Sequence, residues 1–381
     1  MQGAFLNNFA IKVNNIFKYV LPIFGLSMSP PQRRYCRWLL LIAFILSTSS
    51  LLIMFIYIVI TTSVYLSHSK VVIENILTSL SYILTIPSVL LTYVYFYCRR
   101  FAISSVLQKL SHLPSSKTFT KNQWRKQLFQ IILFTLLHLT LIIFHLTTFI
   151  NNQPLLEWTC VIRLMSEKYC KDPSTLAKFE IYCIIETVFL SVFCQFFLST
   201  TYGFFSHICT LLILHFQQMN DKINRIINAK RIMSSDELSK FEKDFLFGEK
   251  MANEVSRIFS PILLIWWFNI VVRLCLLLRI LVRAWAGIFG GLIELSIEIL
   301  RLYVLYKRAS DINKKAKTVS ENFTSLKLTD GGNFRNNHFY FHLLSTQVGI
   351  NVSDLFLINS QTILTVMANI FTYVVVLFQT K

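Results

Sequence analysis

The feature that most constrains this chain is a series of long apolar stretches without charged residues. The stretch from Trp38 to Ile60, WLLLIAFILSTSSLLIMFIYIVI, has no lysine, arginine, aspartate or glutamate. An uncharged run of about 18 residues or more predicts a transmembrane helix, because about 20 helical residues cross the hydrocarbon core of a bilayer. Hydrophobic residues make up 54% of the 381 residues and charged residues only 15%, so the composition also indicates a membrane protein.

The hydrophobic pattern predicts an all-α, polytopic membrane protein with seven transmembrane helices. Only a short stretch separates the fifth span from the sixth, so these two spans are expected to form a tight helical hairpin. The expected spans are Trp38–Ile60, Val71–Tyr97, Leu128–Ile150, Phe179–Tyr202, Phe259–Leu281, Trp285–Leu305 and Val352–Phe378.

The distribution of basic residues predicts the orientation of the spans. The loops on the side of the N-terminus carry 27 of the 37 lysines and arginines, and the opposite loops and span ends carry 8. Because cytoplasmic loops are enriched in lysine and arginine, the N-terminus is expected inside and the C-terminus outside. Contact with anionic lipid also explains the net charge of +18 better than nucleic-acid binding does, so no nucleic-acid partner is expected.

Four regions are expected along the chain. In chain order they are a cytoplasmic N-terminal segment (1–37), a six-span transmembrane bundle (38–305) with long cytoplasmic helix extensions (about 203–258), a cytoplasmic loop and helix (306–351), and a pore-lining seventh span (352–381).

The fourth apolar block is longer than a bilayer needs and is expected to be one long helix that leaves the membrane. Beyond the bilayer, Phe216, Met219, Ile223 and Ile226 follow one another at helical spacing. This apolar stripe predicts that the extension packs against another cytoplasmic helix.

Ionisable residues within the spans are expected to pair or to serve a function, because a bare charge in a bilayer is costly. Arg273 lies near the middle of the fifth span, and Glu294 and Glu298 lie near the middle of the sixth. Since the two spans form a hairpin, Arg273 and Glu294 are expected to pair, either to lock the hairpin or to take part in ligand binding. Apolar walls with a few polar groups are typical of a small-molecule pocket. The candidate pocket, in the outer half of the second to sixth spans, contains Glu186, Trp266, Trp267, Asn269, Arg273 and Glu294.

The sequence contains no arrangement that indicates catalysis, a metal or a cofactor. It has no G-x-S-x-G, H-E-x-x-H or P-loop motif, and no C-x-x-C pair or histidine cluster. The chain is therefore not expected to be an enzyme. Cys160 and Cys170 share the one long outside loop, where an oxidising exterior permits a disulfide, and two free thiols are an equal alternative.

The stretch TYVVVLFQT near the C-terminus has polar groups at both ends of an apolar run. On a helix, Thr372 and Gln379 share one face, with Val375 and Val376 between them and Ala368 one turn earlier. A glutamine is satisfied at the outer end of a helix that lines water. If several subunits place this face around an axis, these five residues are expected to line a pore. A single glutamine that reaches the membrane interface is the alternative.

This last span resembles the C-terminal signature of the insect gustatory receptors, a family of seven-span taste receptor channels related to the insect odorant receptors. Thr372, Tyr373 and Gln379 stand at the signature positions, and Thr380 stands where the family usually has phenylalanine. The signature covers the last span only, whereas the seven-span layout with an inside N-terminus covers the whole chain.

The resemblance implies a ligand-gated, non-selective cation channel in the plasma membrane of gustatory receptor neurons. It implies a homotetramer, or a hetero-oligomer with related receptors, with a pocket for a small tastant in each subunit and no cofactor. The last spans would line the central pore, and the cytoplasmic helices would join the subunits. Sugar-responsive members tend to have an acidic residue directly after the Thr-Tyr pair, where this chain has Val374, so a bitter compound is the better candidate.

A G-protein-coupled receptor is the main alternative, and a secondary transporter is the third. The first needs an outside N-terminus, which the basic residues oppose, and the chain lacks D-R-Y after the third span and N-P-x-x-Y in the seventh. Transporters usually contain two related halves with broken helices, and no internal repeat is visible here.

Overall fold

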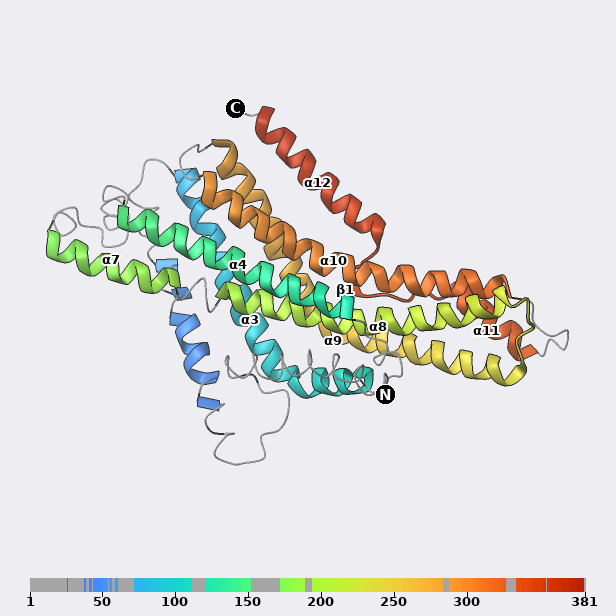
Figure 1. The fold of residues 1–381 in the computed structure, drawn as a ribbon. Helices are drawn as coiled ribbons and strands as arrows, with labels where there is room; N and C mark the ends of the chain where they lie inside the picture. Colours follow the sequence, from blue (N-terminus) through green and yellow to red (C-terminus); the bar gives the residue numbers. More distant parts are fainter. Residues whose placement is uncertain are drawn as a thin grey trace.

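The computed structural model describes most of the chain, and the described part is almost entirely helical (Figure 1). The described residues are 26, 38, 41–42, 44–53, 55–56, 59–60, 72–111, 121–151, 172–188, 194–283, 288–326, 334–353 and 355–379. The elements are α3 (Val72–Ser111), α4 (Lys121–Asn151), α7 (Pro173–Val188), α8 (Phe196–Asn228), α9 (Ser235–Arg283), α10 (Ile288–Thr324), α11 (Phe334–Ser345), β1 (Asn351–Val352), β2 (Phe356–Leu357) and α12 (Ser360–Gln379).

Helices α8, α9 and α10 form the long axis of the molecule. They run side by side from a wider bundle into a narrower extension, and α11 lies near the end of that extension (Figure 1). In the bundle, α3 packs on α9, and α4 packs on α8 and α10. Two described helices are long and apolar enough to cross a membrane by length and composition alone: α8, and α9 as far as Arg279.

The apolar stripe predicted on α8 is buried in the extension. Phe216, Met219, Ile223 and Ile226 are all buried, and the ring of Phe216 meets that of Phe245 on α9 edge-on, with 6.1 Å between centroids. The prediction that this part of α8 packs through one apolar face is therefore confirmed.

A capping box starts α9 and sets the tight turn after α8. The Ser234 hydroxyl accepts a hydrogen bond from the Glu237 N–H at 3.3 Å, and the Glu237 carboxylate accepts one from the Ser234 N–H at 3.2 Å. These reciprocal bonds satisfy N–H groups that the first turn of a helix leaves unpaired. Arg231 also donates to Glu237 at 2.6 Å, and this hydrogen bond is the main cause that holds the pKa of Glu237 below its usual value.

The fourth apolar block, predicted as one long helix, contains the described helices α7 (to Val188) and α8 (from Phe196). Residues 189–193 lie outside the described part of the chain, and Cys194 and Gln195 form a π-helical turn directly before α8. The backbone carbonyl of Gln195 accepts a hydrogen bond from the Arg301 guanidinium at 3.0 Å. A side chain from another helix thus satisfies this carbonyl, which a continuous apolar pattern cannot reveal.

The seventh span differs from its predicted extent, because α12 begins at Ser360 and not at Val352. The residues before it form a short antiparallel hairpin in which Asn351 pairs with Leu357 and Val352 pairs with Phe356. Backbone groups that an early helical turn would have used are therefore paired between β1 and β2.

Side chains of α9 hold this hairpin in place. The N–H of Asn351 donates to the Ser256 hydroxyl at 2.9 Å, and the N–H of Ser353 donates to the Ser260 hydroxyl at 2.5 Å. Residues 256 and 260 are one turn apart, so both hydroxyls lie on one face of α9. The hairpin thereby ties the start of α12 to the middle of α9.

Two predictions lie outside the described residues. The structure does not describe Cys160 and Cys170, the candidates for a disulfide, and it describes only Leu26 of the N-terminal segment 1–37.

Candidate functional site

Arg273 on α9 lies at the centre of a buried polar cluster in the bundle. Its Nη1 donates to the Thr85 hydroxyl on α3 at 2.9 Å, and its Nη2 lies 3.4 Å from Oε2 of Glu294 on α10. Its Nε lies 3.3 Å from Oε1 of Glu298. The ion pair that the sequence predicts between Arg273 and Glu294 is present, and Glu298 is a second partner.

Arg301 on α10 completes the cluster and is fully buried. Its Nη1 donates to Oε1 of Glu298 at 2.6 Å, and its Nη2 donates to Oε1 of Gln195 at 2.7 Å and to the Ser199 hydroxyl at 3.2 Å. Arg301 lies in the predicted sixth span, Trp285–Leu305, but the sequence does not predict these contacts. The spacing of three residues between Glu298 and Arg301 on one helix is the signal that could have found their ion pair.

His138 on α4 is the last member of the cluster. Its Nδ1 lies 2.6 Å from the backbone carbonyl of Phe134, and its Nε2 lies 3.3 Å from Nη2 of Arg301. A carbonyl only accepts and a guanidinium only donates, so Nδ1 carries the proton and Nε2 is an acceptor. His138 therefore completes the contacts of Arg301 as a neutral imidazole.

The cluster joins five helices without net charge. Two guanidinium groups, on α9 and α10, meet two carboxylates on α10, and polar groups of α3, α4 and α8 complete their hydrogen bonds. Charges at this depth persist only when they are paired and hydrogen-bonded. The cluster can therefore fix the relative positions of the five helices.

An aromatic region lies beside the cluster. The indole of Trp266 donates to the Thr92 hydroxyl at 2.9 Å, and its ring meets that of Tyr202 edge-on at 4.6 Å. The Tyr202 hydroxyl and the side-chain amide of Asn269 are buried next to each other, and neither has a further hydrogen-bond partner in the part of the chain that the structure describes. Buried polar groups normally have partners, so Tyr202 and Asn269 are the candidate hydrogen-bonding groups of this region.

The predicted pocket residues do not all converge on this region. Trp266, Asn269, Arg273 and Glu294 lie at or beside the cluster, whereas Trp267 faces the hairpin, with its ring 5.8 Å from that of Phe356. Consecutive helical residues point about 100° apart, so the two neighbouring tryptophans face different parts of the structure. Glu186 belongs to α7, and its side chain is outside the described part of the structure.

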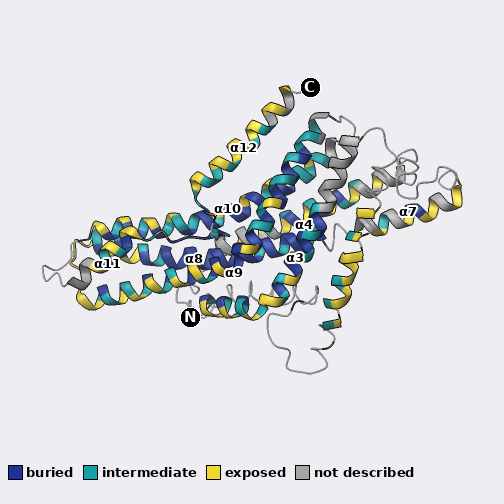
Figure 2. Ribbon diagram, turned by 180° about the vertical axis from the view of Figure 1, so that it is seen from behind, coloured by how far each residue is buried: buried dark blue, intermediate teal, exposed yellow. Residues whose placement is uncertain are grey.

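Helix α12 stands apart from the bundle along most of its length (Figures 1 and 2). Every residue predicted to line a pore is exposed in the single chain: Ala368, Thr372, Val375, Val376 and Gln379. The Thr372 hydroxyl donates to the backbone carbonyl of Ala368 at 2.9 Å, so this polar group is satisfied within the helix. Tyr373, the third residue of the signature, is half-buried.

Exposed apolar side chains lie on α12, in the hairpin and on α11 at the end of the extension. Leu364 and Phe371 on α12 are 70% and 69% exposed, and Leu355 in the hairpin is 69% exposed. On α11, Phe341 and Leu344 are 67% and 54% exposed. Large exposed apolar side chains gathered on one element are typical of contact with a partner or with lipid.

Comparison with known proteins agrees with this architecture. The sequence profile of the family described as 7tm chemosensory receptor matches residues 17–381. The chain therefore belongs to the 7tm chemosensory receptor family, and it is a membrane protein with the seven-span receptor fold. This family consists of receptors and not of enzymes. No curated protein sequence matches the chain.

Solved structures share the fold across the full length. The insect olfactory receptor OR5 from Machilis hrabei superposes with a TM-score of 0.69 at 15% identity, covering 98% of this chain and 100% of that chain. The same receptor in complex with eugenol gives a TM-score of 0.70 at 13% identity, covering 100% of both chains. The predicted all-α class is thereby confirmed.

Proposed function

We propose that this receptor is a gustatory receptor that acts as a ligand-gated, non-selective cation channel of four subunits. The single observation that carries the proposal is the exposed face of α12, which combines the signature residues Thr372 and Gln379 with small and β-branched residues. A lone transmembrane helix with this face would expose the Gln379 amide to lipid. Four copies around an axis would instead turn the face toward a water-filled pore.

The exposed apolar surface supports assembly through a second element. Phe341 and Leu344 on α11 lie in residues 306–351, which the basic residues assign to the cytoplasm, where lipid cannot cover them. Leu355 lies in the hairpin that follows, which we place on the same side. Burial of such side chains against other subunits stabilises an assembly by roughly 1.5–3 kcal/mol for each fully buried residue. Copies of the same chain, or of related receptors, are the proposed partners.

The four predicted regions follow from this assignment. Residues 1–37 and 306–351 and the helix extensions at about 203–258 are proposed to be cytoplasmic, and residues 38–305 contain the six-span bundle. Within residues 352–381, the hairpin belongs to the cytoplasmic side and α12 crosses the membrane, with the C-terminus outside. The proposed location is the plasma membrane of gustatory receptor neurons.

The proposed ligand site is the aromatic region beside the polar cluster. Tyr202 and Asn269 offer hydrogen-bonding groups that find no partner elsewhere among the described residues, and Trp266 offers an apolar wall. This mixture fits a small organic tastant, and the OR5 structure with eugenol is an example of a small-molecule complex on the same fold. Val374 after the Thr-Tyr pair favours a bitter compound over a sugar.

A continuous set of contacts could couple this site to the pore. Trp266 lies at the ligand region, and the next residue, Trp267, packs on Phe356 in the hairpin. Two serines of α9 hold the hairpin, and α12 follows it directly. Movement of α9 on ligand binding is therefore proposed to displace the base of α12.

Patch-clamp recording from cells that express the chain tests this function. A panel of bitter compounds and sugars is applied while G-protein signalling is blocked. Ligand-evoked cation currents that persist under the block are expected. Responses that vanish under the block would instead indicate a G-protein-coupled receptor.

A further inference from the structure

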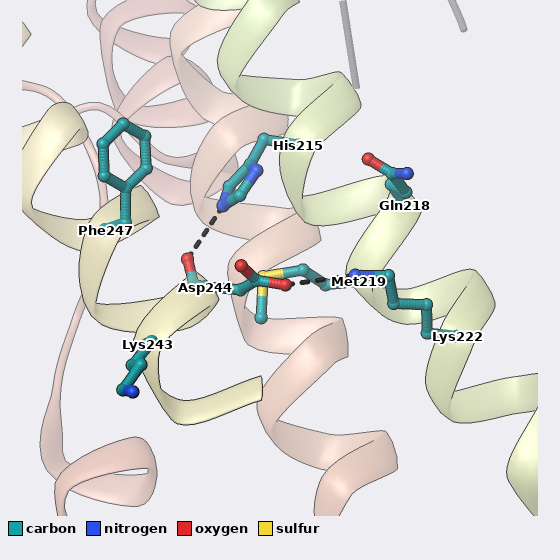
Figure 3. Close-up of a pocket in the computed structure, with 7 residues that line it drawn as sticks. All are labelled: His215, Gln218, Met219, Lys222, Lys243, Asp244 and Phe247. Atoms are coloured by element: carbon teal, nitrogen blue, oxygen red, sulfur yellow. Dashed lines mark hydrogen bonds and ion pairs between the residues drawn. The ribbon is translucent and has the colours of Figure 1, made fainter. Parts of the chain in front are cut away.

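We propose that a cavity between the extensions of α8 and α9 binds a small organic anion with an apolar or aromatic body (Figure 3). Its volume is about 300 Å³, at the lower end of the range for small-molecule sites. It lies far along both helices from the aromatic region, and its existence does not depend on the channel function. The lining residues are His215, Gln218, Met219 and Lys222 from α8, and Lys243, Asp244 and Phe247 from α9.

The helix spacing of the lining residues makes the cavity a defined groove. Those from α8 recur at intervals of three and four residues, and those from α9 lie within one turn, so each set forms one wall. Met219 and His215 are buried and form the base. Lys222 and Lys243 stand on opposite walls in Figure 3.

Two contacts hold the polar part of the groove in position. The Lys222 ammonium lies 3.0 Å from Oδ2 of Asp244, and His215 donates from Nε2 to the Asp244 backbone carbonyl at 2.9 Å. Gly248 allows α9 to approach α8 here, because a Cβ at this position would lie 2.8 Å from the His215 ring. The groove is therefore part of the helix packing.

The charges of the lining favour an anion. The lining has two ammonium groups and one carboxylate, and Asp244 is already paired with Lys222. Lys243 is exposed and has no ion pair with any residue that the structure describes. A single negative charge between the two lysines would neutralise the remaining positive charge of the lining. It would also accept charge-assisted hydrogen bonds from both lysines.

The other lining residues determine which uncharged group the ligand should carry beside its anionic group. Met219 and Phe247 present apolar surface beside the two ammonium groups, and a thioether and an aromatic ring together suit a planar apolar group. An aryl carboxylate matches both properties. The small volume favours such a molecule over a segment of an acidic peptide.

Fluorine NMR on the full chain in lipid nanodiscs tests the site, with para-(trifluoromethyl)benzoate as the probe. We expect saturable line broadening for this acid and binding at least about tenfold weaker for the neutral amide of the same shape, because the amide cannot form the charge-assisted bonds. Lys243→Gln should weaken binding of the acid about tenfold. Lys240→Gln, an exposed lysine one turn away on α9, is the matched control and should change nothing. Gln218→Trp should abolish binding by filling the groove.

Three results would overturn the proposal. One is equal binding of acid and amide, which would mean that the charge does not matter. Another is unchanged binding in Gln218→Trp or Lys243→Gln at unaltered thermal stability, which would place the probe elsewhere. The third is binding of an acidic peptide without binding of the benzoate, which would make the groove a protein-docking surface. Each readout is independent of ion conduction.

Discussion

At the scale of single residues, Gln379 gives the most direct test of the pore. If four copies of this exposed side chain surround the outer mouth, Gln379→Glu should add a ring of carboxylates and raise the permeability of divalent over monovalent cations. Gln379→Lys should reduce cation current, because like charge at a constriction raises the barrier. Reversal potentials and current amplitudes measure both effects. An unchanged ligand-response midpoint serves as the control, and unaltered conduction in channels that reach the surface would contradict the pore assignment.

The two glutamates of the polar cluster can be compared through the same substitution. Glu298 is buried and contacts both Arg273 and Arg301, whereas Glu294 is half-buried and contacts Arg273 at 3.4 Å. Loss of a buried partner leaves a charge uncompensated and costs about 3–5 kcal/mol. Glu298→Gln should therefore lower the melting temperature and surface expression far more than Glu294→Gln does. Equal effects would mean that the second arginine contact contributes little.

The contact between Arg273 and Glu294 can be tested by exchanging the charges. Arg273→Ala should impair expression, because it leaves Glu294 and Glu298 with one partner fewer. The double variant Arg273→Glu with Glu294→Arg should recover part of the loss in a double-mutant cycle. Because Glu298 remains opposite position 273, recovery is expected to be partial. Normal expression of the single variants Arg273→Glu and Glu294→Arg would show that the pair has no structural role.

At the scale of elements, the start of α12 depends on a side-chain cap. Oδ1 of Asn359 accepts from the Thr362 N–H at 2.9 Å, and the Thr362 hydroxyl accepts from the Asn359 N–H at 3.0 Å. Loss of such a cap costs about 1 kcal/mol. Asn359→Ala should speed hydrogen exchange in the first turn of α12 by about fivefold, measured by mass spectrometry, while Asn359→Ser should stay near the native rate. Equal protection in both variants would show that the hairpin alone holds the helix start.

The hairpin and the π-helical turn before α8 share one property as elements. Both lie within an apolar stretch, and both are held by side chains of another helix: the hairpin by Ser256 and Ser260, and the carbonyl of Gln195 by Arg301. Their positions therefore depend on packing and not on local preference.

At the scale of the whole molecule, the orientation can be tested with terminal tags. An antibody should reach an N-terminal tag only after permeabilisation and a C-terminal tag on intact cells, because basic residues concentrate on the side of the N-terminus. Both glycosylation sequons, at Asn322 and Asn351, should then remain unmodified. The Asn322 amide already donates to Asn220 at 2.6 Å. The reverse tag pattern would remove the channel interpretation and favour a G-protein-coupled receptor.

The sequence by itself determined the membrane class, the seven spans and the buried stripe of α8. These depend on apolar run length and helical period, which are properties of neighbouring residues. The sequence also predicted the contact between Arg273 and Glu294, because a short connection between two spans places their midpoints opposite each other. The last span could be assigned to a helix, and its polar face could be read from spacing alone.

Only the tertiary structure decided which distant residues meet. Arg301 contacts Gln195 and His138, which are 106 and 163 positions away, and no local pattern encodes such pairings. Trp266 and Trp267 adjoin in sequence, yet one lies beside Tyr202 and the other beside Phe356, because a helix turns by about 100° per residue. The start of α12 at Ser360 was likewise decided by packing, since the hairpin before it exists only where hydroxyls of α9 can accept its N–H groups.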